Sequence, residues 1–425
     1  MDDKHYINSI KDKLIMDSGT HRNVFPRRNF VKTGMIVAAA AGGSATLRGQ
    51  TAGQGQSAQL LTENRTVRIP DDYDTLQDAL DWESRWVAAQ GVKIILLIQG
   101  GHKLTQNLAI MGGDYSHFWI RSEDEVLRLE PDMVFKTPPT GDVPCLFDCH
   151  HCRAPILDCL VDMERIGRRG YRLFSSSGVI REGAGIRNAE EDGIDCGHGS
   201  TIWIRAGIAT GCGRHNLHVS HGSMCSARTG GRSNFSGATG EFNHHGAGSN
   251  VAFAHSAIGT ISNADCSNAA QDGISAKHGG TGIDCQIVDA SNAGRDGVRA
   301  GDSATVYIRT SNVRNAARHG IRAVNAASIE ARESDVSGAG ANGIFADTAS
   351  RIDAREVRAT NCGNAGIWAG PVSTVNARNA DASGSKGRRG DICVDQGGII
   401  NATNAIGAPS QTVNQLSPSG IIFQG

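Results

Sequence analysis

Acidic and imidazole side chains precede a glycine at regular intervals in the second half of the chain. One such row, a set of equivalent positions in successive repeats, has intervals of 24, 23 and 23 residues and consists of Asp272, Asp296, His319 and Asn342. Asp-Gly and His-Gly pairs extend it upstream, at less even spacing, through His245, His221 and Asp192. Neighbouring carboxyl and imidazole groups can act as general acid and base, because they shift each other's pKa. The predicted acid–base residues are Asp272, Asp296, His245 and His319.

The same row has two other interpretations. Asp-Gly and His-Gly are ordinary turn dipeptides, so the row could serve the backbone alone. A line of carboxylates could also bind Ca²⁺, which prefers oxygen ligands. The spacing does not choose among these roles.

A second row lies two residues after each of these glycines. Its members are Ser275, Arg299, Arg322, Phe345 and Trp368. Arginine binds carboxylates with two parallel hydrogen bonds, and flat aromatic rings stack on sugar rings. The row therefore predicts binding of an acidic polysaccharide through Arg299, Arg322, Phe345 and Trp368. The alternative is an aromatic patch under a loop or at a contact between subunits.

The most regular row is a set of four arginines at intervals of 23 residues: Arg309, Arg332, Arg355 and Arg378. Bare guanidinium groups about 5 Å apart repel by about 3 kcal/mol at an effective dielectric constant near 20. Two residues before each arginine stand Tyr307, Glu330, Asp353 and Asn376, so the middle positions carry their own counter-charges. We interpret this row as a self-paired ladder, with a track for uronate or sulfate groups as the alternative.

Four of the 11 cysteines lie close together in CLFDCHHCRAPILDC, residues 145–159. Zinc binding by Cys149, His151 and Cys152 is one hypothesis, because thiolate and imidazole are preferred zinc ligands. Disulfides, buried thiols or a redox-active pair are the other interpretations. Covalent haem attachment is excluded, because Arg153 stands where that motif requires histidine.

Histidine is also frequent between residues 205 and 255, where the repeat is least regular. Irregular segments of a repeat protein often carry its site, but scattered surface histidines would give the same composition. The residues concerned are His215, His218, His221, His244, His245 and His255.

An internal repeat must position all of these side chains. The glycines just mentioned are Gly273, Gly297, Gly320, Gly343, Gly366 and, by extension, Gly390. The next residue is aliphatic in the first five repeats, and a second aliphatic row follows nine residues after the glycines at Val306, Ile329, Ile352, Val375 and Ile399. An asparagine row five residues before the glycines fits left-handed turns with stacked amides. Aliphatic rows at this period predict a parallel β-solenoid in which each coil lies on the one below.

The segment before the repeats predicts a strand, a helix with an N-cap at Asp74-Thr75 and apolar residues up to Trp86, and a strand over Val92–Ile98. Its TLQDAL motif resembles the N-terminal cap of pectin-lyase-like right-handed β-helices and of phage tail proteins. The C-terminal GGIINATNAIGAPSQTVNQLSPSGIIFQ also resembles endings of phage tail β-helix proteins. The resemblance implies an all-β, right-handed parallel β-helix with an N-terminal helical cap.

Two functions follow from that resemblance. One is a carbohydrate-active protein that binds and cleaves an acidic polysaccharide as a lyase or hydrolase. The other is a non-catalytic tailspike-like or adhesin-like protein, for which a homotrimer is the expected assembly. No pectate-lyase active-site motif matches this sequence, so the family supplies no catalytic assignments.

Composition and the N-terminal segment indicate which partners and which cellular compartment to expect. The net charge of −1 gives no argument for nucleic-acid binding. No run of 18 apolar residues predicts a membrane-spanning helix. Arg27-Arg28 followed by a short apolar run resembles a twin-arginine signal, which implies a periplasmic or secreted protein. The predicted parts are a signal region (1–45), a linker (46–65), a cap with the first coils (66–180), and regular coils with a C-terminal cap (181–425).

Overall fold

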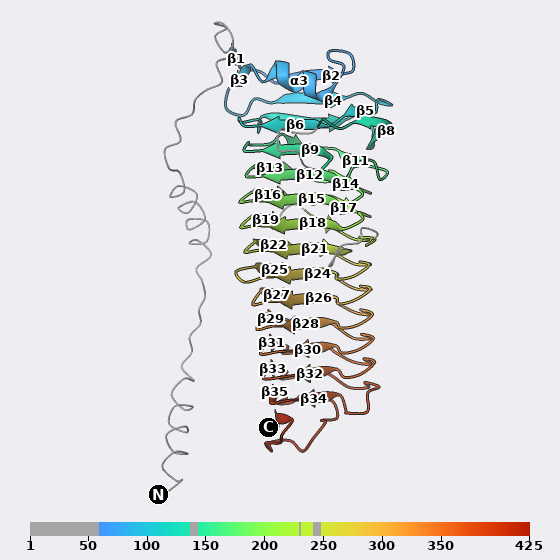
Figure 1. Ribbon diagram of the computed structural model, residues 1–425, viewed down its shortest axis with the longest axis vertical. Coiled ribbons are helices and arrows are strands. Elements are labelled where there is room, and N and C mark those ends of the chain that lie inside the picture. Colours follow the sequence, from blue (N-terminus) through green and yellow to red (C-terminus); the bar gives the residue numbers. More distant parts are fainter. Residues whose placement is uncertain (1–58, 137–142, 229–230, 241–247) are drawn as a thin grey trace, which may run out of the picture. The chain divides into compact units, whose positions relative to one another are not determined.

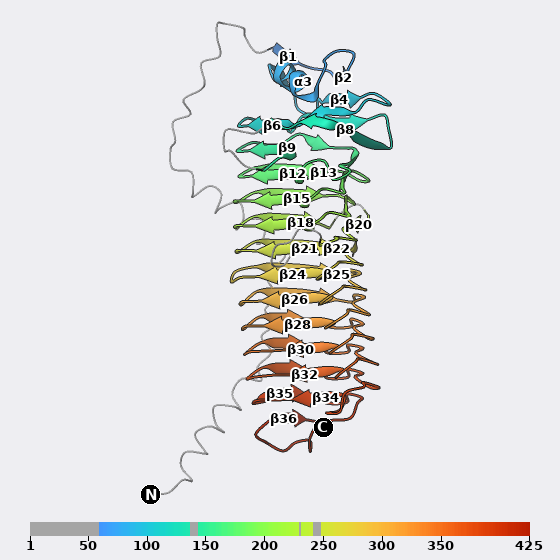
Figure 2. The same ribbon diagram turned by 45° about the vertical axis from the view of Figure 1, so that its right-hand side comes forward.

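The computed structural model describes residues 59–136, 143–228, 231–240 and 248–425. In these residues the chain winds into a solenoid whose coils stack along one axis, and strands of neighbouring coils pair in parallel (Figure 1). Figure 2 shows the same stack turned, with strands on different sides of each coil. The described part is therefore an all-β parallel solenoid with one helix, as the repeat predicted. The signal region at 1–45 lies outside the described residues.

The solenoid has three main sheets. Sheet 1 has 15 strands: β2 (Arg65–Ile69), β4 (Ile94–Ile98), β7 (Phe118–Ser122), β10 (Ile156–Leu157), β13 (Ser177–Ile180), β16 (Thr201–Ile204), β19 (Met224–Ala227), β22 (Ile258–Ser262), β25 (Gly282–Gln286), β27 (Thr305–Arg309), β29 (Ser328–Glu330), β31 (Arg351–Asp353), β33 (Thr374–Asn376), β35 (Gly398–Asn401) and β36 (Gly420–Phe423).

Sheet 2 carries the rows of greatest chemical interest. Its 12 strands are β6 (Leu108–Met111), β9 (Cys145–His150), β12 (Arg169–Phe174), β15 (Asp192–Gly197), β18 (His215–Ser220), β21 (Ser249–Ala254), β24 (Ile274–Lys277), β26 (Val298–Gly301), β28 (Ile321–Val324), β30 (Ile344–Ala346), β32 (Ile367–Ala369) and β34 (Ile392–Val394).

Sheet 3 is the shortest of the three. It consists of β5 (Leu104–Gln106), β8 (Val126–Val134), β11 (Leu160–Asp162), β14 (Gly185–Arg187), β17 (Ile208–Thr210), β20 (Ser233–Asn234) and β23 (Ala264–Asp265). Beyond β23 the same side of the solenoid continues as single parallel bridges from coil to coil. The coils therefore remain stacked where regular strands end.

The helix α3 (Leu76–Glu83) begins after Thr75, whose side chain accepts a hydrogen bond from the backbone N–H of Asp78. It lies at the N-terminal end of the coils, near β2 and β4 (Figure 1). The helix is shorter than predicted, because Trp86 belongs to β3 (Trp86–Ala88), which pairs with β1 (Gln59–Leu61). The strands β1 and β2 also begin inside the segment predicted as a linker. The capping role of α3 stays a prediction.

The predicted rows coincide with the register of the sheets. The aliphatic residues after the glycines pair in β24, β26, β28, β30 and β32 and are fully buried. Glycine is required before them, because a Cβ on Gly320 would lie 2.7 Å from the carbonyl oxygen of Gly343 in the next coil. The asparagine row takes left-handed φ angles, and Asn292 donates a hydrogen bond from Nδ2 to Asn268 Oδ1. Stacking thus explains the repeat.

The last coil departs from the predicted alignment. Ile392 pairs with Ile367, which places Asp391, and not Gly390, at the glycine position. Val375 pairs with Ile400, which is buried, whereas Ile399 is 42% exposed. The prediction was wrong for Gly390 and Ile399, because this coil is longer than the regular spacing.

Candidate functional site

The predicted sugar-binding row lies on the outer face of sheet 2. Strand pairing places Arg299 beside Arg322, Arg322 beside Phe345, and Phe345 beside Trp368. Each follows a fully buried aliphatic residue on its strand, so the side chains project away from the core, and all are half-buried. The rings of Phe345 and Trp368 meet edge to face with centroids 6.1 Å apart. The four residues therefore form one continuous strip across four coils.

The two arginines of this strip, Arg299 and Arg322, each have a buried Nε without a hydrogen bond to the described residues. The nearest carboxylates to Arg322 are Asp296 and Asp347, at 3.9 and 3.6 Å from its terminal nitrogens, beyond hydrogen-bonding distance. Burial lowers the pKa of Arg322, and burial together with the charge of Arg299 lowers the pKa of Lys277. The strip is thus short of negative charge.

The predicted acid–base row is buried beside this strip and bonds to the backbone. Asp272 Oδ1 accepts from the N–H of Asp296, and Asp296 Oδ1 accepts from the N–H of His319. His319 Nδ1 accepts from the N–H of Asn342, whose Oδ1 accepts from the N–H of Ala365. Each side chain of the row thus accepts a hydrogen bond from the backbone of the next coil, at the bend before the glycine. This supports the architectural interpretation of the row.

The individual groups of the row differ in their other contacts. Asp272 forms a two-pronged ion pair with Arg295, so both of its oxygens are occupied. Asp296 Oδ2 has no hydrogen-bond partner in the described residues, and burial, with the charge of Asp272, raises the pKa of Asp296. Burial lowers the pKa of His319 to about 3, and its ring stacks on Phe345. Of the row, Asp296 and His319 lie against this strip, through Arg322 and Phe345.

Upstream, the register corrects the predicted row. Asp192 pairs with His215, and His215 pairs with Ser249, one coil before Asp272. His221 instead occupies the corner that follows β18, so its inclusion in the row was wrong. The uneven spacing there results from the long segment between β19 and β21. His245 lies outside the described residues, and its predicted catalytic role stays a prediction.

A dense network of charges lies on the same face, toward the N-terminal end of sheet 2. His218 Nδ1 lies 2.9 Å from Asp195 Oδ1, and Arg169 Nη1 donates to Asp195 Oδ2 at 2.7 Å. Asp192 is bound by Arg214 through both oxygens. The sequence had pointed to His218 only as one of several histidines, and it had not pointed to Asp195 or Arg169. These residues come from neighbouring coils, and the strand register places Asp195 beside His218.

The contacts of this network determine the orientation of one imidazole ring, that of His218. Burial alone would raise the pKa of Asp195, but the hydrogen bond with His218 and the charge of Arg169 lower it. Asp195 is therefore a carboxylate that orients the ring of His218, which is 19% exposed. The ring of His215 stacks near it, with centroids 5.4 Å apart, and burial lowers the pKa of His215 to about 3.

Asp192, Asp195 and His218 also form the one group of three possible metal ligands among the described residues, with ligand atoms within 4.8 Å of one another. Arg169 and Arg214 already bind the two carboxylates. A cation would therefore have to displace arginines from them.

The cysteine cluster does not have the geometry of the hypothetical zinc site. Cys149 and Cys152 are buried in the core, whereas His151 is exposed at a corner. All 11 cysteines lie within the described residues, and all are free and buried. The buried-thiol interpretation is therefore supported over disulfides. Beside this cluster, Asp148 Oδ1 lies 2.8 Å from His150 Nε2, with both side chains buried.

The regular arginine row runs along sheet 1: Arg309 ends β27, and the other three lie two residues after β29, β31 and β33. Arg309, Arg332 and Arg355 have the predicted acidic partners. Arg309 Nη2 lies 2.8 Å from Glu330, and Arg332 lies 3.1 Å from both Glu330 and Asp353. Arg355 donates to both oxygens of Asp353, at 2.9 and 2.7 Å. The acidic residues stack in register with Tyr307 and Asn376. These guanidinium groups are thus provided with partners inside the protein.

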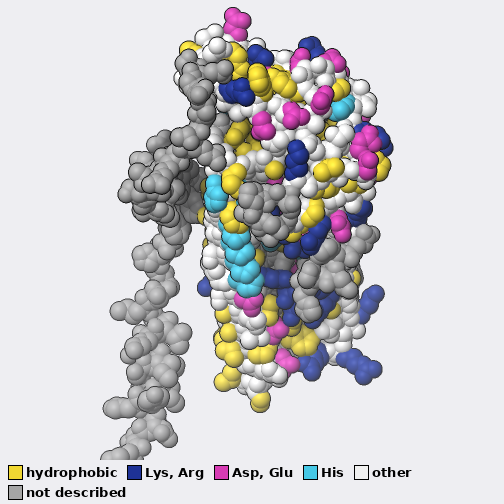
Figure 3. Space-filling view, turned by 45° about the horizontal axis from the view of Figure 1, so that its top comes forward, with side chains coloured by type: hydrophobic (Ala, Val, Ile, Leu, Met, Phe, Trp, Pro, Cys, Tyr) yellow, Lys and Arg dark blue, Asp and Glu magenta, His cyan; other side chains and the backbone are white. Residues whose placement is uncertain are grey.

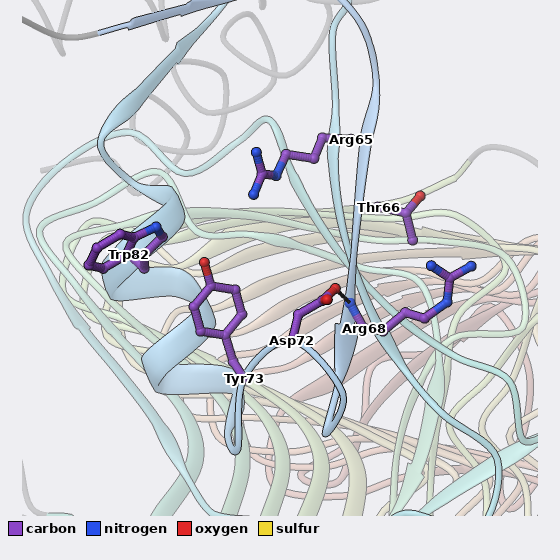
Figure 4. A pocket seen from close by; sticks show the side chains of 6 residues that line it. All are labelled: Arg65, Thr66, Arg68, Asp72, Tyr73 and Trp82. Carbon is purple, nitrogen blue, oxygen red and sulfur yellow. Dashed lines mark hydrogen bonds between the residues drawn. The ribbon is translucent and has the colours of Figure 1, made fainter.

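An open hollow also occurs at the N-terminal end of the coils, and Arg65, Asp72, Tyr73 and Trp82 are among its lining residues (Figure 4). Glu83 Oε1 accepts hydrogen bonds from Arg65 and Tyr73, both at 2.9 Å. Burial and the bond to Glu83 raise the pKa of Tyr73 to about 12. The carboxylate of Asp72 accepts a hydrogen bond from the backbone N–H of Arg68, and no predicted site residue lines this hollow.

No helix in the described part of the chain is long and apolar enough to span a membrane. A search of curated proteins gives no match to this sequence. Among solved structures, the chain is similar to the Dettilon tailspike protein, with 12% identity, a TM-score of 0.46, and coverage of 85% of this chain and 68% of the other. It is also similar to the A-module of the Azotobacter vinelandii mannuronan C-5 epimerase AlgE4, with 12% identity, a TM-score of 0.37, and coverage of 82% and 89%.

The repeats themselves match a protein family. Residues 249–406 match the family described as the right-handed β-helix region. This segment contains the regular coils of sheet 2 from β21 to β34, with Arg299, Arg322, Phe345 and Trp368. Over these residues the chain is thus similar to right-handed β-helix proteins, in agreement with the predicted fold.

Proposed function

We propose that this protein binds an acidic polysaccharide along the outer face of sheet 2. The observation that carries the proposal is the pair of half-buried arginines, Arg299 and Arg322, whose Nε donors have no partner in the described residues. Buried donors without partners cost free energy, which a bound acceptor would recover. A carboxylate matches the two-pronged guanidinium group in charge and shape.

The surroundings of the arginines favour a polymer over a small anion. Phe345 and Trp368 continue the strip for two further coils and offer flat faces for sugar rings. On the other side, the small residues Ser275 and Ala252 separate Arg299 from His218. Because coils repeat at about 4.8 Å, His218 and Arg322 are roughly 19 Å apart along the face. That length suits an oligosaccharide with several charged units.

Calorimetry with polygalacturonate and alginate fragments tests the proposal. The variant Arg299→Ala/Arg322→Ala should bind at least about a hundredfold more weakly, since charged hydrogen bonds contribute roughly 1.5–3 kcal/mol each. The matched control, Arg332→Ala/Arg355→Ala, removes two arginines of sheet 1 and should bind within about twofold of the wild type. Equal losses in both variants would show nonspecific charge attraction and reject the site.

A second candidate function, cleavage of the bound polymer, has its own observation in the Asp195–His218 pair. An ionised Asp195 orients the ring of His218 through the contact with Nδ1, which is the arrangement that general acid–base chemistry needs. His218 would then abstract the proton next to a uronate carboxylate in a lyase, or protonate the leaving oxygen in a hydrolase.

Product formation tests this second function separately from binding. Absorbance of unsaturated uronates would reveal a lyase, and new reducing ends without that absorbance would reveal a hydrolase. His218→Asn should abolish either product while changing affinity by less than about threefold. Binding without any product from the wild type would leave the non-catalytic, tailspike-like or adhesin-like alternative.

Export and assembly belong to the same proposal. A twin-arginine signal at Arg27-Arg28 would deliver the folded protein to the periplasm or beyond. Replacement of both arginines by lysine should retain the protein in the cytoplasm, as fractionation would measure. Sedimentation would test the homotrimer expected of a tailspike-like protein.

A further inference from the structure

Four exposed histidines form a ladder along one corner of the solenoid. His198, His221, His255 and His278 each follow directly after a strand of sheet 2, namely β15, β18, β21 and β24. Successive ring centroids are 4.6, 4.6 and 4.1 Å apart, and the ring planes differ by 2–16°. The histidines of this face form a continuous stripe in Figure 3. We call these four residues the histidine ladder.

The backbone of the corner explains how histidine can recur there. All four residues have left-handed φ angles between 52° and 69°. Asparagine, aspartate and histidine are the residues other than glycine that most often adopt this conformation. The same corner carries Asp302 after β26 and Asn325 after β28, also at positive φ. The backbone conformation of this corner is therefore compatible with aspartate and asparagine as well as with histidine.

The imidazole nitrogens of the ladder are available to a ligand. Of the four rings of the ladder, only that of His221 forms a hydrogen bond within the described residues, between Nδ1 and the hydroxyl of Ser220. The face-to-face spacing suits neutral rings, because two charged rings about 4.5 Å apart repel by about 1 kcal/mol in bulk water. A neutral imidazole has one nitrogen with a free lone pair, and it is the commonest metal ligand of proteins.

We propose that adjacent members of the histidine ladder bind divalent transition-metal ions, with Zn²⁺ as the probe, through one nitrogen from each of two neighbouring coils. Two nitrogens on one tetrahedral zinc lie roughly 3.3 Å apart, since each Zn–N bond is about 2.0–2.1 Å. Rings 4.1–4.6 Å apart reach that separation when they tilt toward each other, and their exposure leaves room for this movement. Water completes the coordination. The site is independent of the polysaccharide proposal.

Two double variants of equal composition test the ladder. His221→Asn/His255→Asn leaves two histidines with no adjacent partner, whereas His198→Asn/His278→Asn leaves the adjacent pair His221 and His255. Asparagine is suited to this corner, as Asn325 shows. Calorimetric titration with Zn²⁺ should show an affinity at least about tenfold weaker in the first variant than in the second, because only the second retains a chelating pair.

Two results would overturn the proposal. One is equal zinc affinity in the two double variants. The other is a greater loss of zinc affinity in His218→Asn than in His221→Asn/His255→Asn, which would assign the zinc to Asp192, Asp195 and His218. Single replacement of His151, at the same corner but beside Phe174 and not another histidine, serves as a control and should not change the affinity. Unchanged circular dichroism and thermal unfolding would show that the variants fold.

Discussion

The outer faces of sheet 1 and sheet 2 both carry arginines in successive coils, but the guanidinium groups of the two rows differ in their ion-pair and hydrogen-bond partners. On sheet 1, Glu330 and Asp353 lie between the guanidinium groups at 2.7–3.1 Å. On sheet 2, Arg299 and Arg322 are directly adjacent, and their Nε atoms have no hydrogen-bond partner in the part of the chain that the structure describes. The guanidinium groups of Arg309, Arg332 and Arg355 thus have close carboxylate partners within the protein, whereas the carboxylates near Arg322 lie 3.6 and 3.9 Å away. The proposed function rests on this difference and not on the regularity of either row.

Loss of a buried ion pair should have the largest effect on stability. Asp272→Ala leaves Arg295 without its two-pronged partner and removes the acceptor for the backbone of Asp296. The free energy of unfolding should fall by about 3–5 kcal/mol, as expected when one partner of a buried pair is removed. Denaturant unfolding measures this change. Asp353→Ala on sheet 1, where the carboxylate is more exposed, should cost about 1 kcal/mol, and a reversed order would contradict the comparison.

Low pH should reduce the stability of the folded protein through His319, which lies beside the outer face of sheet 2. Its pKa of about 3 in the folded protein lies below the ordinary 6.5, so the unfolded chain takes up the proton first as pH falls. The contribution of His319 is complete above about pH 6.5 and declines between pH 6.5 and 3. His319→Asn should reduce this decline in thermal unfolding, because asparagine keeps an acceptor for the next coil, as Asn342 does. An unchanged pH profile would mean that His319 does not titrate as described.

A counter-charge supplied to sheet 2 should make its arginines resemble those of sheet 1. Ser275 lies beside Arg299 in the same row, so Ser275→Asp places a carboxylate next to the guanidinium group. Affinity for uronate fragments should fall roughly tenfold, equivalent to about 1.4 kcal/mol. Ser275→Asn is the control of equal size and should bind as the wild type does. Equal affinities of the Asp and Asn variants would exclude Arg299 from binding.

The smallest effect is expected on the exposed part of sheet 1. Arg355→Ala removes the bidentate contact with Asp353, yet Arg332 still accompanies that carboxylate. The free energy of unfolding should fall by less than about 1 kcal/mol, as for other surface ion pairs, with no change in affinity for uronate fragments. A larger change in affinity would show that the ladder is itself a ligand track.

The repeat alone was sufficient to predict the solenoid, because each coil must place the same kinds of side chain against its neighbours. The buried aliphatic row, the left-handed asparagine row and the paired arginines of sheet 1 all follow from that requirement. Prediction was weaker where a coil changed length. Asp391 replaced Gly390 in the last coil, which is longer than the regular spacing, and His215 replaced His221 upstream, where a long segment separates β19 from β21.

Only the tertiary structure decided which polar side chains meet. Arg169, Asp195 and His218 come from three successive coils, and the repeat does not show which side chains of neighbouring coils lie within hydrogen-bonding distance. The histidine ladder likewise requires four corners to align in space across unequal intervals in sequence. The sequence by itself determined the stacked coils, since repeated burial needs repeated residues. The partners of charged groups were decided by the register of the folded chain, since ion pairs and ring contacts depend on distances between coils.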